Sequence, residues 1–123
     1  MSLNKVVNKN KDLYDIYIGR GSKWGNPFTH KDVDKTKAQV QVSSRKESIE
    51  MYEKWILRII EIEGLNPPSI EEIRSELKDK VLGCFCKPKS CHGDVLSQIA
   101  NGDNQDIEKM KQKYLKTEKK TIF

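Results

Sequence analysis

The chain has 123 residues, of which 36% are hydrophobic and 33% charged, with a formal net charge of +5. This length supports one domain with a single hydrophobic core. No apolar run approaches the ~20 residues that cross a bilayer, and the first residues lack the apolar stretch of a secretory signal, so we expect a cytoplasmic protein. The positive charge favours anionic partners such as nucleotides or nucleic acid, or else it only solubilises a lysine-rich surface.

Two short segments near the start of the chain predict β-strands. Residues 5–8 (KVVN) form a short apolar run, and residues 13–19 (LYDIYIG) place β-branched and aromatic side chains with a period of two. The following segment, GRGSKWGNPFTHKD, is rich in turn-forming residues and predicts an ordered loop. Residues 31–42 are polar and weakly patterned, and we predict no regular structure for them.

Two helices are predicted in the middle of the chain, and both begin with an S-x-x-E capping box. The first lies within residues 43–64, with a wide apolar face and with Gly64 in the position of a C-terminal cap. The same pattern assigns Trp55 to the core. After two consecutive prolines, the second helix covers residues 69–77.

The last third of the chain predicts a buried strand followed by helices. Residues 80–86 (KVLGCFC) form a continuous apolar run, which is typical of a strand covered on both faces. Residues 92–101 have helical spacing. We therefore predict an α/β fold, a small Rossmann-like three-layer sandwich with a mostly parallel sheet. Residues 1–102 form its single domain, and residues 103–123 form a lysine-rich C-terminal helix or tail.

Both informative motifs begin where a predicted strand ends. Ligands of open α/β sheets bind beyond the carboxyl ends of the strands. If the strands that end at Ile18 and Cys86 are parallel neighbours, the two loops that follow them face each other across one crevice. This is the central structural prediction from the sequence.

The first loop carries groups that suit a phosphate-bearing ligand. An arginine fork and a lysine bind phosphate, an indole stacks on a base, and glycines allow the backbone to approach closely. The candidate ligand-binding residues are Gly19, Arg20, Gly21, Lys23, Trp24 and Asn26. The competing interpretation is a tight structural loop in which Trp24 fills an edge of the core.

The second loop, within GCFCKPKSCHGD, contains every cysteine of the chain. An odd set of three closely spaced cysteines indicates a reducing compartment and no disulfide scaffold. One interpretation is a zinc site with the ligands Cys84, Cys86, Cys91 and His92, although the C-x-C spacing is tighter than usual. Another is ordinary structure, because thiols in an apolar strand are common core residues.

A third interpretation of this loop is a reactive or ligand-binding pocket at a helix N-terminus, where the helix dipole favours a thiolate or an anion. The candidate catalytic residues are Cys91, His92 and Asp94, with His92 as the proton-transfer group. Lys87 and Gly93 are the candidate ligand contacts. Asp94 also has a purely structural explanation, because an acid in the first turn stabilises a helix.

The stretches YIGRGSKWGNPF and LGCFCKPKSCHGDVLSQIAN together resemble the family called domain of unknown function 4326. Its members are small proteins of bacteria, bacteriophages and other viruses, with a Y-x-x-W/Y-like pattern on a central helix. The resemblance covers about residues 5–102, and it implies an α/β domain without an established activity. The chain departs from the family pattern at Phe85, where tryptophan is common, and in its lysine-rich extension.

These observations predict a phage- or virus-related protein that binds a nucleotide or another phosphate-bearing ligand between the two loops. Hydrolysis or transfer of a nucleotide or glycosidic group is the corresponding reaction class. The alternative is a non-enzymatic module, stabilised by zinc, that binds nucleic acid or a host protein. In a further alternative, a small inhibitor of viral origin binds its partner through residues 103–123.

Overall fold

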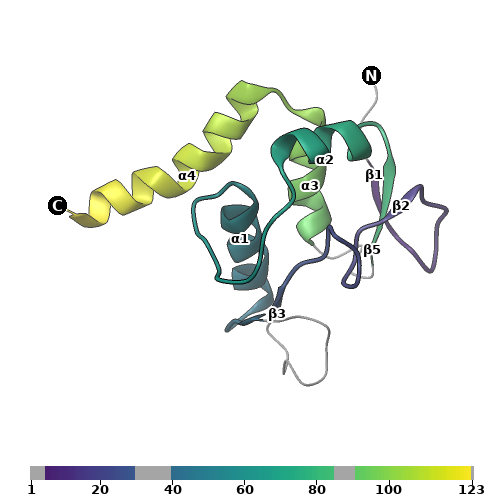
Figure 1. Cartoon of the computed structure of the whole chain (residues 1–123), viewed down its shortest axis with the longest axis horizontal. Coiled ribbons are helices and arrows are strands. Elements are labelled where there is room, and N and C mark those ends of the chain that lie inside the picture. The colour runs from purple at the N-terminus through teal and green to yellow at the C-terminus, as the bar shows by residue number, and fades with distance from the viewer. Residues whose placement is uncertain (1–4, 30–39, 85–90, 123) are drawn as a thin grey trace.

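The computed structural model describes residues 5–29, 40–84 and 91–122, including all of their side chains except those of Lys5 and residues 116–122. Short strands and helices surround one core (Figure 1). The strands are β1 (Lys5–Asn8), β2 (Ile16–Tyr17), β3 (Phe28–Thr29), β4 (Val40–Gln41) and β5 (Val81–Cys84). The helices are α1 (Arg45–Ile56), α2 (Ile70–Leu77), α3 (His92–Asn101) and α4 (Asn104–Ile122).

The main sheet has three parallel strands in the order β1-β5-β2. β5 lies in the centre, with Leu82 opposite Val6 on one side and Ile16 on the other. The prediction that the strands before the two motif loops are parallel neighbours is therefore confirmed. A second, separate sheet consists of β3 paired in parallel with β4. The sequence predicted no regular structure for the residues of β4.

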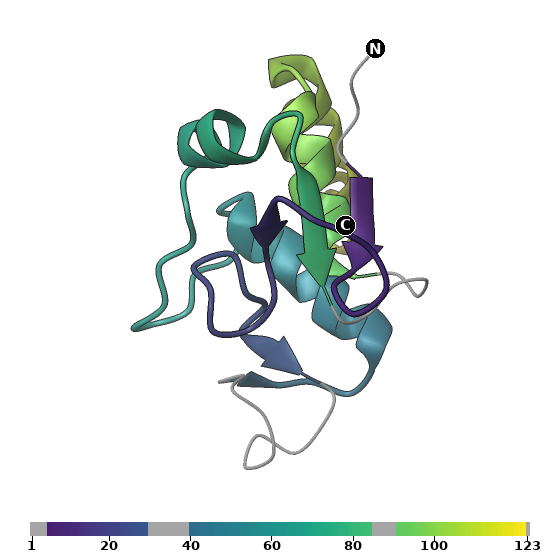
Figure 2. The same cartoon turned by 90° about the vertical axis from the view of Figure 1, so that its right-hand side faces the viewer.

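The mixed α/β class with small parallel sheets is confirmed, but a third layer is not. In Figure 2 the three-stranded sheet lies in front of α1 and α3, and no described helix crosses its front face. Successive residues of β5 point to opposite faces of the sheet. The Cys84 side chain contacts Cys91 at the start of α3, whereas Gly83 faces outward and lies against the ring of Tyr14. A tyrosine from a loop thus covers the centre of the outer face, where the prediction placed a helix.

The first long helix is shorter than predicted, because α1 ends at Ile56 and not at Gly64. The N–H of Ile59 donates to Lys54 O at 2.8 Å, and the N–H of Arg58 donates to Trp55 O at 3.1 Å. Arg58 has a φ of 64°. These bonds form a Schellman motif with an arginine in the left-handed position that glycine usually occupies. The left-handed cap residue, Arg58, therefore comes six residues earlier than Gly64, the predicted cap.

The other predicted helices are confirmed. The capping serines predicted for α1 and α2 also take their expected role: the hydroxyl of Ser44 accepts the N–H of Glu47 at 3.1 Å, and that of Ser69 accepts the N–H of Glu72 at 3.0 Å. The strand predicted over residues 13–19 is confirmed only for β2. Of residues 80–86, β5 covers 81–84, and residues 85 and 86 lie outside the described part of the chain.

The C-terminal segment is a helix that packs against the domain through its first half. Ile107 of α4 is 6% exposed and belongs to the hydrophobic core. Further along, the carboxylate of Glu53 on α1 accepts hydrogen bonds from Lys113 Nζ, at 2.8 Å, and from the hydroxyl of Tyr114. The end of α4 projects away from the rest of the molecule (Figure 1). No helix in the described residues is long and apolar enough to span a membrane.

Candidate functional site

The two motif loops meet at the carboxyl edge of the sheet. His92, the first residue of α3, lies 2.6 Å through its Nε2 from the carbonyl oxygen of Ile18, the residue after β2. Because a carbonyl only accepts hydrogen bonds, Nε2 carries the proton. The imidazole also packs edge-on against Tyr52, at 5.0 Å between ring centroids. His92 therefore joins the end of β2 to α3 and α1.

Gly93 has little room for a side chain at this junction. A Cβ at Gly93 would lie 2.7 Å from Ile18 Cδ1 and 2.8 Å from Val6 Cγ1. Both distances are shorter than carbon atoms tolerate without movement of their neighbours. The glycine of the late motif thus allows α3 to begin directly against β1 and the end of β2.

The three predicted catalytic residues lie together at the start of α3, where each has a structural partner. Cys91 is 2% exposed, and its sulfur lies 3.3 Å from the sulfur of Cys84, a contact and not a covalent bond. Asp94 accepts the backbone N–H of Cys91 at 3.2 Å and thereby caps the helix. His92 is 6% exposed. A catalytic role for these residues remains a prediction.

The structure does not test the zinc interpretation. The sulfurs of Cys84 and Cys91 lie 3.3 Å apart, closer than the roughly 3.7 Å between two thiolates that each lie about 2.3 Å from one tetrahedral zinc. The Nε2 atom of His92 is directed to Ile18 O. Cys86 and Lys87 lie outside the described residues, and among the described ones no three His, Cys, Asp or Glu side chains form a metal-binding group. The four-ligand site remains a prediction.

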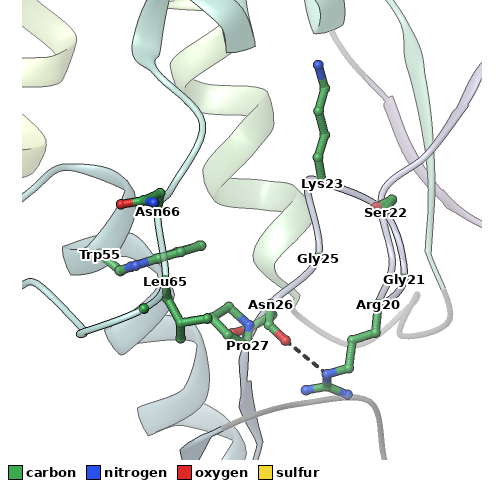
Figure 3. A pocket seen from close by; sticks show the side chains of 11 residues that line it. Arg20, Gly21, Ser22, Lys23, Gly25, Asn26, Pro27, Trp55, Leu65 and Asn66 are labelled. Carbon is green, nitrogen blue, oxygen red and sulfur yellow. Dashed lines mark hydrogen bonds between the residues drawn. The ribbon is translucent and has the colours of Figure 1, made fainter.

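Arg20 in the early motif turns back onto its own loop. Its Nε donates to Asn26 O at 3.0 Å, and its Nη2 donates to Phe28 O at 2.7 Å. Asn26 continues this network, because its Oδ1 accepts the N–H of Phe28 at 2.8 Å and its Nδ2 donates to Ser48 Oγ at 2.9 Å. The guanidinium therefore closes the loop (Figure 3). The bond to Ser48 ties the loop to α1 through Asn26.

The glycines of the early motif permit this tight turn. Gly21 has a φ of 98°, in the left-handed region that favours glycine. A Cβ at Gly25 would lie 3.0 Å from the backbone of both Gly19 and Arg20. Gly19 lies against the ring of Tyr17, whose hydroxyl donates to Arg20 O at 3.1 Å.

Trp24 belongs to the core, with 4% of its surface exposed. Its carbonyl accepts the hydroxyl of Tyr52 at 2.8 Å, and burial raises the pKa of that hydroxyl well above its usual value. Because the indole is buried, the structure gives no support to a stacking role for Trp24, which remains a prediction. The interpretation of this residue as a core side chain holds.

Lys23, next to Trp24, points outward. Its ammonium lies 2.7 Å from Glu72 and 2.6 Å from Glu76, both on α2. The hydrogen bond to Glu72 is the main cause that raises the pKa of Lys23, and the same bond lowers the pKa of Glu72. Lys23 thus attaches the early loop to α2 at the surface.

A surface pocket of about 360 Å³ lies beside the early loop (Figure 3). One wall is the loop itself, and the opposite wall is the connection between α1 and α2. The lining residues are Arg20, Gly21, Ser22, Lys23, Gly25, Asn26, Pro27, Trp55, Gly64, Leu65 and Asn66. No described residue of the late motif is among them, so the pocket differs from the predicted crevice between the two loops.

Trp55 has a place in the pocket that the sequence did not reveal. It packs in the core, as predicted, against Phe28 and Tyr52, and it also lines the pocket. Its indole N–H is buried and has no hydrogen-bond partner in the described part of the chain. The Y-x-x-W pattern of Tyr52 and Trp55 was the signal that could have linked α1 to the site.

A family model matches residues 2–102 of this chain. The chain belongs to the family described as Domain of unknown function (DUF4326). A relative from Enterobacteria phage T4, described as an uncharacterised 12.4 kDa protein in the nrdA-td intergenic region, is 37% identical over 99 residues. The aligned region is 80% of this chain and 79% of the relative. No solved structure matches the chain.

Both motif loops lie within the family match, whereas α4 begins two residues beyond it. The DUF4326 match therefore covers the three-stranded sheet, the pocket and α1 to α3. The likeness to a phage protein supports the predicted relation to phages, and α4 lies outside the residues that the family model matches.

Proposed function

We propose that the chain binds a nucleotide or another small phosphate-bearing molecule in the pocket beside the early motif loop. One observation carries the proposal. Seven of the eleven lining residues come from the stretch between Arg20 and Pro27, and two of these seven are cationic. A tight, glycine-containing loop with two cationic residues along the lining of a hollow is suited to an anionic ligand.

The size and lining of the pocket agree with this proposal. A volume of about 360 Å³ is near the lower end of the range for small-molecule sites, about 300–1,000 Å³. Leu65 supplies apolar surface, with only the small exposed part of Trp55 beside it, and Ser22 and Asn66 supply polar groups. Such a mixture suits a ligand with one flat apolar part and one charged part, as in a nucleotide.

Lys23 is the group that we expect to respond to the ligand. It is half-exposed and shared between two carboxylates, so a phosphate in the pocket would compete with them for its ammonium. The guanidinium of Arg20 would keep its bonds to the loop carbonyls and contribute through its charge. The proposal therefore assigns Lys23 to ligand binding and Arg20 to holding the loop.

Hydrolysis or transfer of a nucleotide or glycosidic group remains a further prediction. The proposed proton-transfer group, His92, donates to Ile18 O and does not line this pocket. None of the described lining residues is a carboxylic acid, a histidine or a cysteine. Binding is accordingly the function that we propose.

A thermal-shift screen of nucleoside mono-, di- and triphosphates tests the proposal. A ligand at ten times its Kd adds about 1.4 kcal/mol to the free energy of unfolding, which is several degrees in Tm. We expect at least one nucleotide to raise the Tm of the wild type, and Lys23→Gln to reduce that shift. Lys46→Gln, an exposed lysine of α1, is the charge-matched control. The proposal fails if no nucleotide shifts the wild type, or if the two variants respond alike.

The contact between Cys84 and Cys91 favours a second candidate, a non-enzymatic module in which zinc ties β5 to α3. Metal analysis of protein purified in reductant without added metal tests it. Zinc near one per chain in the wild type, and loss of that zinc in each of the variants Cys84→Ser and Cys91→Ser, would support this candidate. Metal-free protein with an unchanged melting curve would eliminate it.

A further inference from the structure

We propose that the helix-free face of the three-stranded sheet binds single-stranded nucleic acid, with Tyr14 as a stacking platform for a base and Lys9 and Lys11 as phosphate contacts. This surface is separate from the pocket beside the early loop, and none of these three residues lines that pocket. The inference therefore goes beyond the proposed function and does not depend on it.

The two large exposed apolar residues of the described chain are neighbours in one loop beside this face. Leu13 is 96% exposed and Tyr14 is 40% exposed, and they are the large hydrophobic residues that the described part of the chain leaves exposed. Both belong to the loop that connects β1 to β2. Figure 2 shows this loop on the side of the sheet that no described helix covers. A fully exposed leucine beside a half-exposed tyrosine indicates a contact surface more than a solubilising loop.

The ring of Tyr14 lies against the central strand of the sheet. A Cβ at Gly83 would lie 2.6 Å from Tyr14 Cγ and 2.9 Å from both Cδ atoms, so the ring occupies the space above this glycine. The backbone of β5 thus supports one side of the ring, while the side chain keeps much of its surface exposed. An aromatic ring supported on a sheet in this way is a common platform for an unstacked base.

Two lysines belong to the same part of the chain as Tyr14. The side chain of Tyr17, on the neighbouring strand β2, is on the same face of the sheet, and the ammonium of Lys9 lies 5.3 Å from its ring centroid. Lys11, between Lys9 and the exposed pair, is itself exposed. The acidic groups of the same loop are Asp12 and Asp15, and the carboxylate of Asp15 accepts the N–H of Val81 at 2.7 Å. An aromatic surface bordered by lysines complements bases joined by phosphates.

This charge pattern favours nucleic acid over a second copy of the chain. A symmetric dimer through this face would require the lysines of each copy to meet acidic groups of the other, whereas a single strand supplies phosphates to them directly. A single strand presents its negative charge along the lysine border and its bases to the tyrosine. The net charge of +5 would also attract the strand at long range.

Fluorescence anisotropy with a labelled oligothymidylate of about 12 nucleotides tests the proposal, with RNA of the same length and duplex DNA alongside. We expect the wild type to bind the single strands more tightly than the duplex. Tyr14→Ser should weaken binding roughly 5- to 100-fold, because loss of a stacked base costs this much, whereas Tyr14→Phe should retain it. Lys9→Gln should weaken binding and reduce its salt dependence, unlike the control Lys46→Gln.

Leu13→Ser is a second variant that tests the same surface if Tyr14→Ser does not fold. Because Leu13 is 96% exposed, its replacement should leave the Tm unchanged and still weaken binding severalfold. The proposal is overturned if the wild type binds no single strand at about 50 mM salt, or if Leu13→Ser and Tyr14→Phe bind alike. It is also overturned if sedimentation shows a dimer that Leu13→Ser converts to a monomer, because the face would then be an interface between copies.

Discussion

The two family motifs meet at one edge of the sheet, yet they are built differently. In the late motif, Cys91 and His92 turn inward, and the polar groups described there bond to sulfur, carbonyl and carboxylate partners within the domain. In the early motif, Arg20 and Trp24 turn inward in the same way, but Lys23 and the surrounding backbone line a pocket. The late motif therefore holds the fold together, and the early motif combines that task with a surface that can receive a ligand.

The largest expected effect follows from the contact that joins the motifs. His92→Ala removes the bond to Ile18 O and the edge-on contact with Tyr52, and it leaves a cavity and an unpaired buried carbonyl. We expect the free energy of unfolding in urea to fall by about 3 kcal/mol. A loss below about 1 kcal/mol would show that the late motif does not hold the fold, and the comparison would break.

Gly93→Ala should have the next largest effect. The new Cβ would lie 2.7 Å from Ile18 Cδ1 and 2.8 Å from Val6 Cγ1, so we expect a destabilisation of about 1–3 kcal/mol in the same urea experiment. Gly64→Asn is the control, because Gly64 has open space around it and asparagine tolerates its φ of 82°. If the control costs as much as Gly93→Ala, close packing at Gly93 is not the cause.

Tyr52→Phe tests the link between the early motif and α1. The variant keeps the aromatic ring and removes the hydroxyl that donates to Trp24 O. Because both groups are buried, the free energy of unfolding should fall by about 1–2 kcal/mol. A neutral variant would show that this bond does not fix the early loop.

The smallest expected effect is a pH dependence at Lys23. The pKa of Glu72 is lowered from 4.5 in the folded chain, so its contribution to stability is present above pH 4.5 and is lost as the pH falls through the folded value. The pKa of Lys23 is raised from 10.5, so its contribution is present below pH 10.5 and is lost as the pH rises through the folded value. The difference in Tm between the wild type and Lys23→Gln should therefore be constant between these limits and disappear in acid. A difference that does not shrink as the pH falls below 4.5 would contradict this assignment.

The sequence predicted those parts of the fold that depend on local signals. The capping serines marked the starts of α1 and α2, and the apolar run marked β5. The contact between the two loops also followed, because parallel neighbouring strands end at the same edge. The end of α1 did not follow, since an arginine and not a glycine occupies its left-handed position.

The pocket depended on features that the sequence does not display. Its second wall, at Gly64 to Asn66, exists because α1 ends early and the chain returns beside the early loop. Trp24 and Trp55 have the same local signals for aromatic packing, and only the tertiary arrangement makes Trp55 a lining residue of the pocket. The pairing of β4 with β3 is likewise a tertiary contact without a local pattern.

The most direct test of the difference between the motifs is the ligand-induced change in Tm of Lys23→Gln and His92→Gln, measured with the nucleotide that most stabilises the wild type. We predict that His92→Gln melts at a lower temperature but keeps the full ligand-induced shift. Lys23→Gln should melt close to the wild type and lose most of that shift. The reverse result, with ligand response lost in His92→Gln and kept in Lys23→Gln, would place ligand binding at the late motif and contradict the account.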